Sequence, residues 1–391
     1  MGRGGGTAEP GASYRTGRRN PAVPRLPPRS RAEPTTLGAV SAPRDLSSGP
    51  DAVRGRRILV TGGSGTIGAR LVDHLLAREP EVVRIFGRDE TKQFYQRQRY
   101  RGRADVRFLI GDIRDRDRLL RATEGVDVVI HCAALKHVES GEYNPFEAAQ
   151  TNVTGTQNVI DACLAADVGT MILTSSDKAA NPTSVMGASK LLAEKLVTAA
   201  TNYRGHHRTV FASVRFGNVL ASRGSAVELF AAQVAAGGQV TVTDPAMTRF
   251  VMSTDRAVEL ALEAARVAHG GEVFVFKMPA ARLADLVAGA IAVFAPRHGR
   301  AASEIAVTRI PVRPGEKGYE ELMTEEESLR ARDVGPMYAV LPAIDTPHDL
   351  IEAYAHAPLA PAGAYRSDGV EPMAADEVAA VLREAVDGLE P

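Results

Sequence analysis

Ile58-Leu-Val-Thr-Gly-Gly-Ser-Gly-Thr-Ile-Gly68 is an apolar run followed by three glycines in the spacing GxxGxxG. The run predicts a buried strand, and the periodicity after it predicts a helix that opens near Thr66. Gly62 permits a tight turn, Gly65 lets the backbone approach a pyrophosphate, and Gly68 lets the helix pack closely on the strand. We therefore predict a dinucleotide-binding turn, with the phosphates at the N-terminus of the helix.

The same alternation of strand and helix continues from Arg57 to about Ala221. Nearly continuous apolar character suits strands that are covered on both faces, as in a parallel sheet. Repeated βα units predict an α/β fold with a doubly wound parallel (Rossmann) sheet. The predicted strands are Ile58–Val60, Val82–Phe86, Val106–Ile110, Val128–His131, Met171–Thr174 and Val210–Arg215, and the predicted helices are Thr66–Arg78, Arg116–Ala122, Phe146–Ala166 and Val185–Tyr203.

Composition and periodicity divide the chain into four regions. The first 50 residues hold eight Arg, no Lys, three acids, eight Gly and eight Pro, so residues 1–54 are predicted to be a disordered basic extension with few groups to bury. Residues 55–221 form the predicted NAD(P)-binding domain. Residues 222–342, where the alternation loosens, form mainly a substrate-binding region, although a strand near 273–276 is a candidate to rejoin the first sheet. Residues 343–391 are a tail with an amphipathic helix at Ala374–Leu389.

Several classes of protein are disfavoured by the composition. Lys+Arg and Asp+Glu both number 47, which removes the electrostatic argument for a nucleic-acid partner. The longest uncharged apolar run, Leu286 to Pro296, is too short to cross a membrane. Cys132 and Cys163 cannot form a disulfide framework, which favours the cytoplasm. No metal site is predicted, because the adjacent His206 and His207 lack Cys or acidic partners at ligand spacing.

The loops after the second, third and fourth predicted strands supply further candidates for the cofactor. Arg88 and Lys92 suit a 2′-phosphate, which favours NADP, whereas Asp89 suits a ribose hydroxyl and keeps NAD as the alternative. Asp112 and Ile113 fall at the adenine edge, and residues 133–135 on the nicotinamide side. The cofactor-binding residues predicted from this pattern are Gly62, Ser64, Gly65, Thr66, Ile67, Gly68, Arg88, Asp89, Lys92, Asp112, Ile113, Ala133 and Ala134.

Three further motifs resemble the extended short-chain dehydrogenases. They are His131-Cys-Ala-Ala, Asn152 in Thr-Asn-Val-Thr-Gly-Thr, and Lys190 in Met186-Gly-Ala-Ser-Lys190. Within that superfamily, other segments are similar to the UDP-N-acetylglucosamine 4,6-dehydratases of capsule, flagellin and O-antigen pathways. These segments include Phe86-Gly-Arg-Asp-Glu-Thr-Lys-Gln93, Ala133-Ala-Leu-Lys-His-Val138, Ser175-Ser-Asp-Lys-Ala-Ala-Asn-Pro182, Arg215-Phe-Gly-Asn-Val219, Thr243-Asp-Pro-Ala-Met-Thr-Arg-Phe250 and Arg313-Pro-Gly-Glu-Lys317.

The resemblance implies a reaction without net oxidation. Sugar C4 is oxidised by hydride transfer to NAD(P)+, water leaves across C5–C6, and the hydride returns to C6. Asp177 and Lys178 occupy the family positions of the acid for the 6-hydroxyl and the base for C5–H. We expect desolvation under the bound sugar to raise the pKa of Asp177 and to lower that of Lys178, as these roles require. Ser176 would polarise the C4 oxygen.

Methionine replaces the usual catalytic tyrosine at Met186. A thioether accepts no proton at neutral pH, so Lys190, Lys178 or a held water would serve as the base at C4. Dehydratases of this family that carry methionine at this position are known, so activity is expected. By resemblance Lys190 would also hold the nicotinamide ribose, together with Asn152 and Lys136 as further cofactor contacts. The predicted substrate-binding residues are Lys136, Asn218, Arg223, Arg249 and Arg313, which would hold the UDP group.

The leading hypothesis is thus a 4,6-dehydratase of UDP-N-acetylglucosamine or a related UDP-sugar, with possible inversion at C5. We expect a homo-oligomer, as in relatives. Two enzymatic alternatives are a UDP-sugar 4-epimerase, which should not need Asp177 and Lys178, and a 5,6-dehydratase, which can retain them. A non-catalytic NADP-binding regulator would explain Met186, but gives no reason to keep the acid, lysine and arginine set together.

Overall fold

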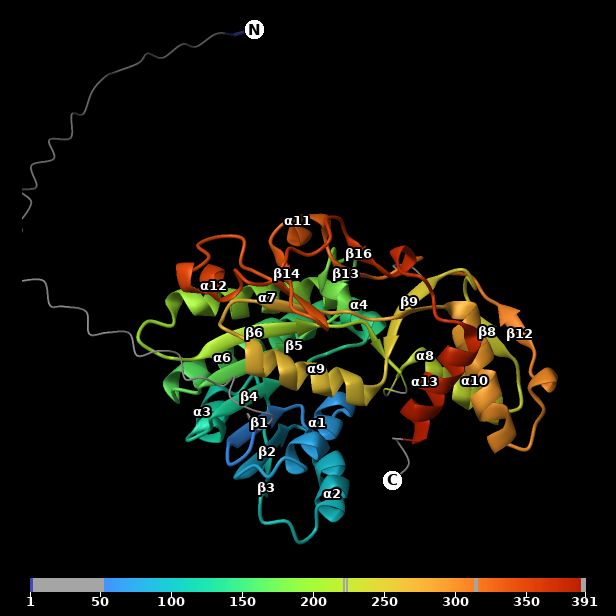
Figure 1. The fold of residues 1–391 in the computed structure, drawn as a ribbon, viewed down its shortest axis with the longest axis horizontal. Helices are drawn as coiled ribbons and strands as arrows, with labels where there is room; N and C mark the ends of the chain where they lie inside the picture. The colour runs from blue at the N-terminus through green and yellow to red at the C-terminus, as the bar shows by residue number, and fades with distance from the viewer. Residues whose placement is uncertain (3–52, 221, 223, 313–315, 388–391) are drawn as a thin grey trace, which may run out of the picture. The chain divides into compact units, whose positions relative to one another are not determined.

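The computed structural model describes residues 1–2, 53–220, 222, 224–312 and 316–387. A nine-stranded sheet forms the centre of the part that begins at residue 53 (Figure 1). In spatial order its strands are β14 (Ala331–Asp333), β15 (Met337–Val340), β10 (Val273–Phe276), β6 (Val210–Arg215), β5 (Thr170–Thr174), β4 (Val128–His131), β1 (Arg57–Thr61), β2 (Val82–Gly87) and β3 (Val106–Ile110). Pairing is parallel from β3 to β10, and β15 and β14 extend that edge antiparallel. The predicted doubly wound sheet is confirmed.

The strand order reverses between β1 and β4. β2 and β3 continue from β1 on one side, whereas β5 and β6 continue from β4 on the other. Loops that leave the carboxyl ends of two such strands diverge and open a crevice, which is where sheets of this kind bind ligands. The glycine-rich turn follows β1, and residues 133–135 follow β4. Both predicted cofactor loops therefore border the crevice.

Helices cover both faces of the sheet. Because parallel crossovers are right-handed, the connection from β1 to β2 and the connection from β4 to β5 lie on opposite faces. On the first face α1 (Thr66–Leu76) packs against α9 (Thr254–Val267); on the second, α6 (Gly155–Ala165) packs between α3 (Arg116–Thr123) and α7 (Val185–Tyr203). Within the described ranges, no helix is both long and apolar enough to cross a membrane.

The predicted substrate-binding region adds smaller elements beside the main sheet. Figure 1 shows α8 (Ala226–Ala235), α10 (Leu283–Arg297) and α13 (Ala375–Asp387) gathered with β8 (Val240–Val242) and β12 (Val307–Arg309) at one end. The predicted tail helix thus packs on α10. The remaining elements are β7 (Asn218–Val219), β9 (Thr248–Met252) and β11 (Ala280–Arg282), which form a three-stranded sheet; β13 (Glu321–Met323) paired with β16 (Tyr365–Arg366); and the short helices α4 (Val138–Tyr143), α5 (Pro145–Ala149), α11 (Glu325–Ser328) and α12 (His348–Ala353).

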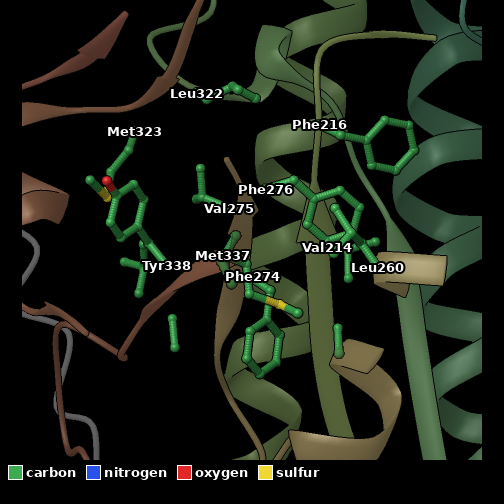
Figure 2. Packing of buried hydrophobic residues seen from close by; sticks show 14 of the residues in the cluster. Val214, Phe216, Leu260, Phe274, Val275, Phe276, Leu322, Met323, Met337 and Tyr338 are labelled. Atoms are coloured by element: carbon green, nitrogen blue, oxygen red, sulfur yellow. The ribbon is translucent and has the colours of Figure 1, made fainter. Parts of the chain in front are cut away.

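An apolar cluster around β10 supports the sheet where it meets the later elements. Figure 2 shows Phe274 and Phe276 of β10 among side chains from β6, α9, β13 and β15. The rings of Phe216 and Phe276 stack with centroids 5.5 Å apart. All four residues of β10 are buried and the strand pairs with β6, so residues 273–276 lie in the first sheet.

Two elements differ from those expected from the sequence. The predicted helix Phe146–Ala166 is instead α5 and α6 joined by a π-helical turn at Gln150–Thr154. Such turns shift the helix register by one residue and are frequent at functional sites. The prediction also missed α2 (Glu90–Arg99), whose N-terminus is capped by the Asp89 carboxylate, which accepts a hydrogen bond from the Lys92 backbone N–H at 2.9 Å. Only one buried residue lies on this polar helix, so its apolar periodicity is weak.

Candidate active site

The glycine-rich turn has the backbone that the motif predicts. Gly62 has φ +68°, and a Cβ at this position would lie 2.7 Å from the Ala133 nitrogen, so a side chain is excluded by conformation and by space. α1 begins at Thr66 without a side-chain cap on its N-cap residue Gly65, and its first turn holds no acid. An uncapped helix N-terminus favours an anion, so this turn fits a dinucleotide pyrophosphate.

The loops predicted to hold the adenosine carry polar side chains that contact one another. Lys92 Nζ lies 2.9 Å from an Asp89 carboxylate oxygen, and Arg88 lies 3.4 Å from Asp112. Asp112 also accepts a hydrogen bond from the Arg114 backbone N–H at 2.9 Å. Arg88 and Lys92 are about half exposed, so both side chains can turn toward a ligand phosphate. Asp89 and Asp112 therefore hold the two loops in shape in the ligand-free protein.

The chemical end is a short turn that follows β5. Ser176 Oγ accepts from the Lys178 backbone N–H at 3.2 Å and donates to Asp177 Oδ1 at 2.8 Å. The Lys178 ammonium lies 3.0–3.1 Å from both carboxylate oxygens of Asp177, which is only 5% exposed. The Asp177 backbone N–H donates to the Phe216 carbonyl at 3.0 Å, which ties the turn to the end of β6. Asp177 and Lys178, the predicted acid and base, thus form one hydrogen-bonded group with Ser176.

The charges around Lys178 oppose the lowering of its pKa that is expected from desolvation under the bound sugar. Burial does lower the pKa of this amine, but the carboxylates of Asp177 and Glu320 outweigh burial. The pKa of Lys178 therefore lies above its ordinary value. The sequence reasoning considered burial alone and could not include Glu320, which is distant in the chain.

Met186 and Lys190 lie on the first turns of α7, which begins after the N-cap residue Ser184. Met186 is 4% exposed and contacts the cavity with its side chain. Lys190 Nζ donates to the Thr174 carbonyl at 2.6 Å. Burial lowers the pKa of the Lys190 amine to about 8, although the Glu194 carboxylate opposes this effect. Lys190 is thus the cavity lysine whose pKa lies close to neutrality.

Asn152 positions other groups rather than facing the cavity. Its side-chain amide accepts from the Leu135 N–H at 2.8 Å and donates to the Leu135 carbonyl at 3.0 Å and to Ser189 Oγ at 2.9 Å. It therefore joins the loop after β4 to α7. The π-helical turn that carries Asn152 brings this amide to the loop, beside Lys136, which does line the cavity.

The expected diphosphate end contains two carboxylates that the sequence reasoning missed. Arg249 lies 3.3 Å from Glu316 and 3.7 Å from Glu320. Glu320 also accepts a hydrogen bond from the Asn218 side chain at 2.7 Å. Glu316 is the acid within the Arg313-Pro-Gly-Glu-Lys317 motif and Glu320 follows it by three residues, so this motif was the available signal. The predicted residues Arg223 and Arg313 lie outside the described residues.

One cavity of about 800 Å³ joins the glycine-rich turn, the chemical turn and the diphosphate end. Its walls come from the loops at the carboxyl ends of the sheet and from the region of α8, β8 and β9. Predicted residues that line it are Gly62, Gly65, Thr66, Ile67, Gly68, Lys92, Ala134, Lys136, Ser176, Asp177, Lys178, Met186, Lys190, Asn218 and Arg249; those outside its lining are Ser64, Arg88, Asp89, Asp112, Ile113, Ala133 and Asn152.

The fold and the glycine-rich turn define an extended short-chain dehydrogenase, as the sequence predicted. More particularly, the chain belongs to the family of polysaccharide biosynthesis proteins, whose sequence profile matches residues 58–342.

Known relatives fall into more than one activity class. A protein of Methanocaldococcus jannaschii named uncharacterized membrane protein MJ1061 is 49% identical over 73% of this chain and 86% of its own. An inverting UDP-N-acetylglucosamine 4,6-dehydratase of Campylobacter jejuni is 39% identical over 74% of this chain and 84% of its own. A UDP-glucose 4-epimerase of Rickettsia canadensis is 38% identical over 73% and 82%.

Similarity to a solved structure covers more of the chain than the family profile does. Pen from Bacillus thuringiensis is 41% identical and superposes with a TM-score of 0.78 over 85% of this chain and 98% of its own. The dTDP-glucose 4,6-dehydratase DesIV of Streptomyces venezuelae, solved with NAD, shares the fold at 21% identity and a TM-score of 0.60.

Proposed function

We propose that the protein is a nicotinamide-dependent UDP-N-acetylglucosamine 4,6-dehydratase that inverts C5. The hydrogen-bonded group of Ser176, Asp177 and Lys178 carries the proposal, because it shares one cavity with the glycine-rich turn. An acid and a base side by side are what elimination of water across one C–C bond requires. The Campylobacter relative supports both the substrate and the inversion.

A nicotinamide dinucleotide would supply the reversible hydride acceptor at C4. The glycine-rich turn would hold its pyrophosphate, and Lys190 would lie by the nicotinamide ribose. We propose NADP, because Lys92 lines the cavity and Arg88 lies across the same loop. An arginine donates two parallel hydrogen bonds to a phosphate and a lysine contacts it as a point charge, so both side chains suit a 2′-phosphate.

The chain's own groups divide the proton transfers between them. Lys190 accepts the C4 hydroxyl proton, which Met186 cannot do, while Ser176 polarises the same oxygen. Lys178 removes the C5 proton once the C4 ketone has made it acidic. Asp177 delivers a proton to the departing 6-hydroxyl. Arg249 and Asn218 hold the diphosphate, which fixes the sugar over this turn.

A UDP-sugar 4-epimerase is the competing proposal, because the Rickettsia relatives bear that name. Epimerisation needs hydride removal and return at C4 but no acid at the 6-hydroxyl. The Asp177–Lys178 pair gives an epimerase no evident benefit, so we favour dehydration.

Proton NMR of the purified protein with UDP-N-acetylglucosamine and NADP+ in D2O tests the proposal. We expect a new 6-methyl signal with deuterium from solvent at C5 and no accumulation of NADPH. The same reaction in H2O keeps the C5 proton, whose signals give the C5 configuration. A galacto-configured product would favour the epimerase, and an exocyclic alkene would favour a 5,6-dehydratase. Unchanged substrate, repeated with UDP-glucose, would reject catalysis on both sugars.

A further inference from the structure

Glu320 lies behind the cavity wall, between the chemical end and the diphosphate end. It is 8% exposed and precedes β13. One carboxylate oxygen accepts from Asn218 Nδ2 at 2.7 Å and lies 3.7 Å from Arg249 Nε, and the other accepts from the Phe250 N–H at 2.9 Å. A single buried carboxylate therefore contacts both of the described side chains that the proposed function assigns to the diphosphate.

The C-terminal region holds Glu320 in this place. The Glu320 N–H donates to Ser367 Oγ, and the Ser367 N–H donates to the Glu320 carbonyl, both at 2.9 Å. Ser367 is fully buried and its hydroxyl also lies 2.8 Å from Thr248 Oγ1. These two hydrogen bonds fix the backbone of Glu320, so its carboxylate stays beside Asn218 and Arg249.

We propose that Glu320 is a positioning residue that couples binding of the UDP diphosphate to the ionisation of the Asp177–Lys178 pair. This inference rests on the proposed function, since it uses the same diphosphate site. Glu320 acts through Arg249, Asn218 and Lys178 and does not itself line the cavity.

The charges around Glu320 explain the coupling. β13, which directly follows Glu320, contacts the turn Asp177–Ala179, and Glu316 lies on the other side of Arg249. Burial and the Asp177 charge raise the pKa of Glu320 to about 7, although Lys178, Arg249 and the hydrogen bond from Asn218 oppose this. A diphosphate on Arg249 adds negative charge nearby, so Glu320 binds a larger fraction of a proton from solvent.

Protonation of Glu320 then changes Lys178. The Glu320 carboxylate, like that of Asp177, contributes to the raised pKa of Lys178. Once Glu320 is neutral, Lys178 has lost one of the two anions that favour its ammonium form, and its pKa falls toward the value that a base requires. Binding of the nucleotide thus prepares the base.

Calorimetric titration with UDP-xylose tests the coupling without turnover, because this sugar has no C6 and cannot lose water across C5–C6. Titrations at pH 7.5 in two buffers of different ionisation enthalpy give the number of protons bound. We expect net proton uptake by the wild type, none by Glu320→Gln, and restored uptake by Glu320→Asp. Glu316→Gln, which changes the other carboxylate on Arg249, should retain the uptake.

The pH profile of kcat/KM for UDP-N-acetylglucosamine, which reports the groups of the protein before the nucleotide binds, supplies a second readout. Loss of one negative charge should move both limbs of the Glu320→Gln profile to lower pH by about one unit, and Glu320→Asp should restore them. A purely structural role would lower the rate at every pH without moving the limbs.

The two proposals fail in different ways. Wild-type proton uptake in Glu320→Gln, or an unmoved profile in a folded variant, overturns the role of Glu320 while dehydration stands. Uptake that depends on Glu320, without dehydration of any UDP-sugar, supports the coupling and rejects the dehydratase. If UDP-xylose does not bind, the same titration is made with UDP, which carries the diphosphate: failure of UDP to bind overturns the coupling, whereas the NMR experiment alone decides the dehydratase.

Discussion

At the scale of single residues, the methionine at position 186 determines which group accepts the proton from C4. Met186 lines the cavity but offers only a thioether. Two lysines lie at the chemical end of the cavity, and their pKa values are displaced in opposite directions: the pKa of Lys178 is raised, whereas burial lowers that of Lys190 to about 8. Of these two, Lys190 is therefore the one that loses its proton more readily.

Lys190 should produce the acidic limb of the pH profile. Its neutral form accumulates as pH rises through about 8, so we expect kcat to increase between pH 7 and 9. Lys190→Arg keeps a cation that stays protonated throughout this range, and should lower kcat by about 10²–10⁴-fold. Initial rates across this range, with cofactor binding measured separately, check the prediction. Full activity in Lys190→Arg would transfer the role of the base to a water molecule.

Asp177 and Lys178 should be separable by isotope exchange. Asp177→Asn and Lys178→Ala are both expected to abolish dehydration, with losses of at least about 10²-fold, and to leave cofactor binding intact. Lys178→Ala should also stop deuterium from entering C5, because it removes the base. Mass spectrometry of the recovered sugar in D2O measures this. Normal turnover by both variants would show that the site has been assigned wrongly.

At the scale of elements, sequence patterns predicted what is local and buried. The central strands were predictable because they are buried on both faces, and the glycine-rich turn because its spacing is fixed by the helix that follows it. The polar helix α2 was missed because its contact surface is small. The antiparallel strand β15 was missed because its partner β10 is distant in the chain, and the short strand β14 pairs only with β15.

In the candidate site, too, residues close in sequence were predictable and residues that only the fold brings together were not. Asp177 and Lys178 are adjacent in sequence and were predictable together. Glu320 contacts Asn218 from 102 residues away, so only the fold brings the two together. The pKa of Lys178 is raised although burial lowers it, because the charge of the neighbouring Asp177, with a further contribution from the distant Glu320, outweighs burial.

The packing of α13 on α10 gives a prediction for an element. Leu382 and Val378 lie against Gly289 of α10, where a Cβ would meet them at 3.0 and 3.3 Å. Leu382 is fully buried, so Leu382→Ala should lower the free energy of unfolding by about 2–5 kcal/mol. Urea denaturation measures this, with the exposed Glu384→Ala as the matched control. Equal stability of the two variants would mean that α13 does not stay docked in solution.

At the scale of the whole molecule, one cavity depends on regions that are far apart in the chain. The carboxyl ends of the early strands supply the glycine-rich and chemical turns, and β9 supplies Arg249. Ser367, from the C-terminal part, fixes Glu320 behind the wall. The region after Ala343, whose role the sequence left open, thus contributes to the shape of the site without lining it.

The N-terminal boundary gives a prediction for the molecule. The Gly, Pro and Arg content of the first 50 residues led us to expect that residues 1–54 are dispensable, but two of these residues contact the fold. Val53 packs partly against the core around β1, and Arg54 lies 2.5 Å from Glu79.

We therefore expect deletion of residues 1–52 to leave Tm and kcat unchanged. Deletion of residues 1–54 should reduce the free energy of unfolding by about 1 kcal/mol, since an exposed ion pair adds at most that much and the apolar contact is partial. Thermal denaturation of the two truncated proteins beside the full chain tests this, and a large loss of stability or rate in the shorter deletion would show that the first 52 residues take part in folding or catalysis.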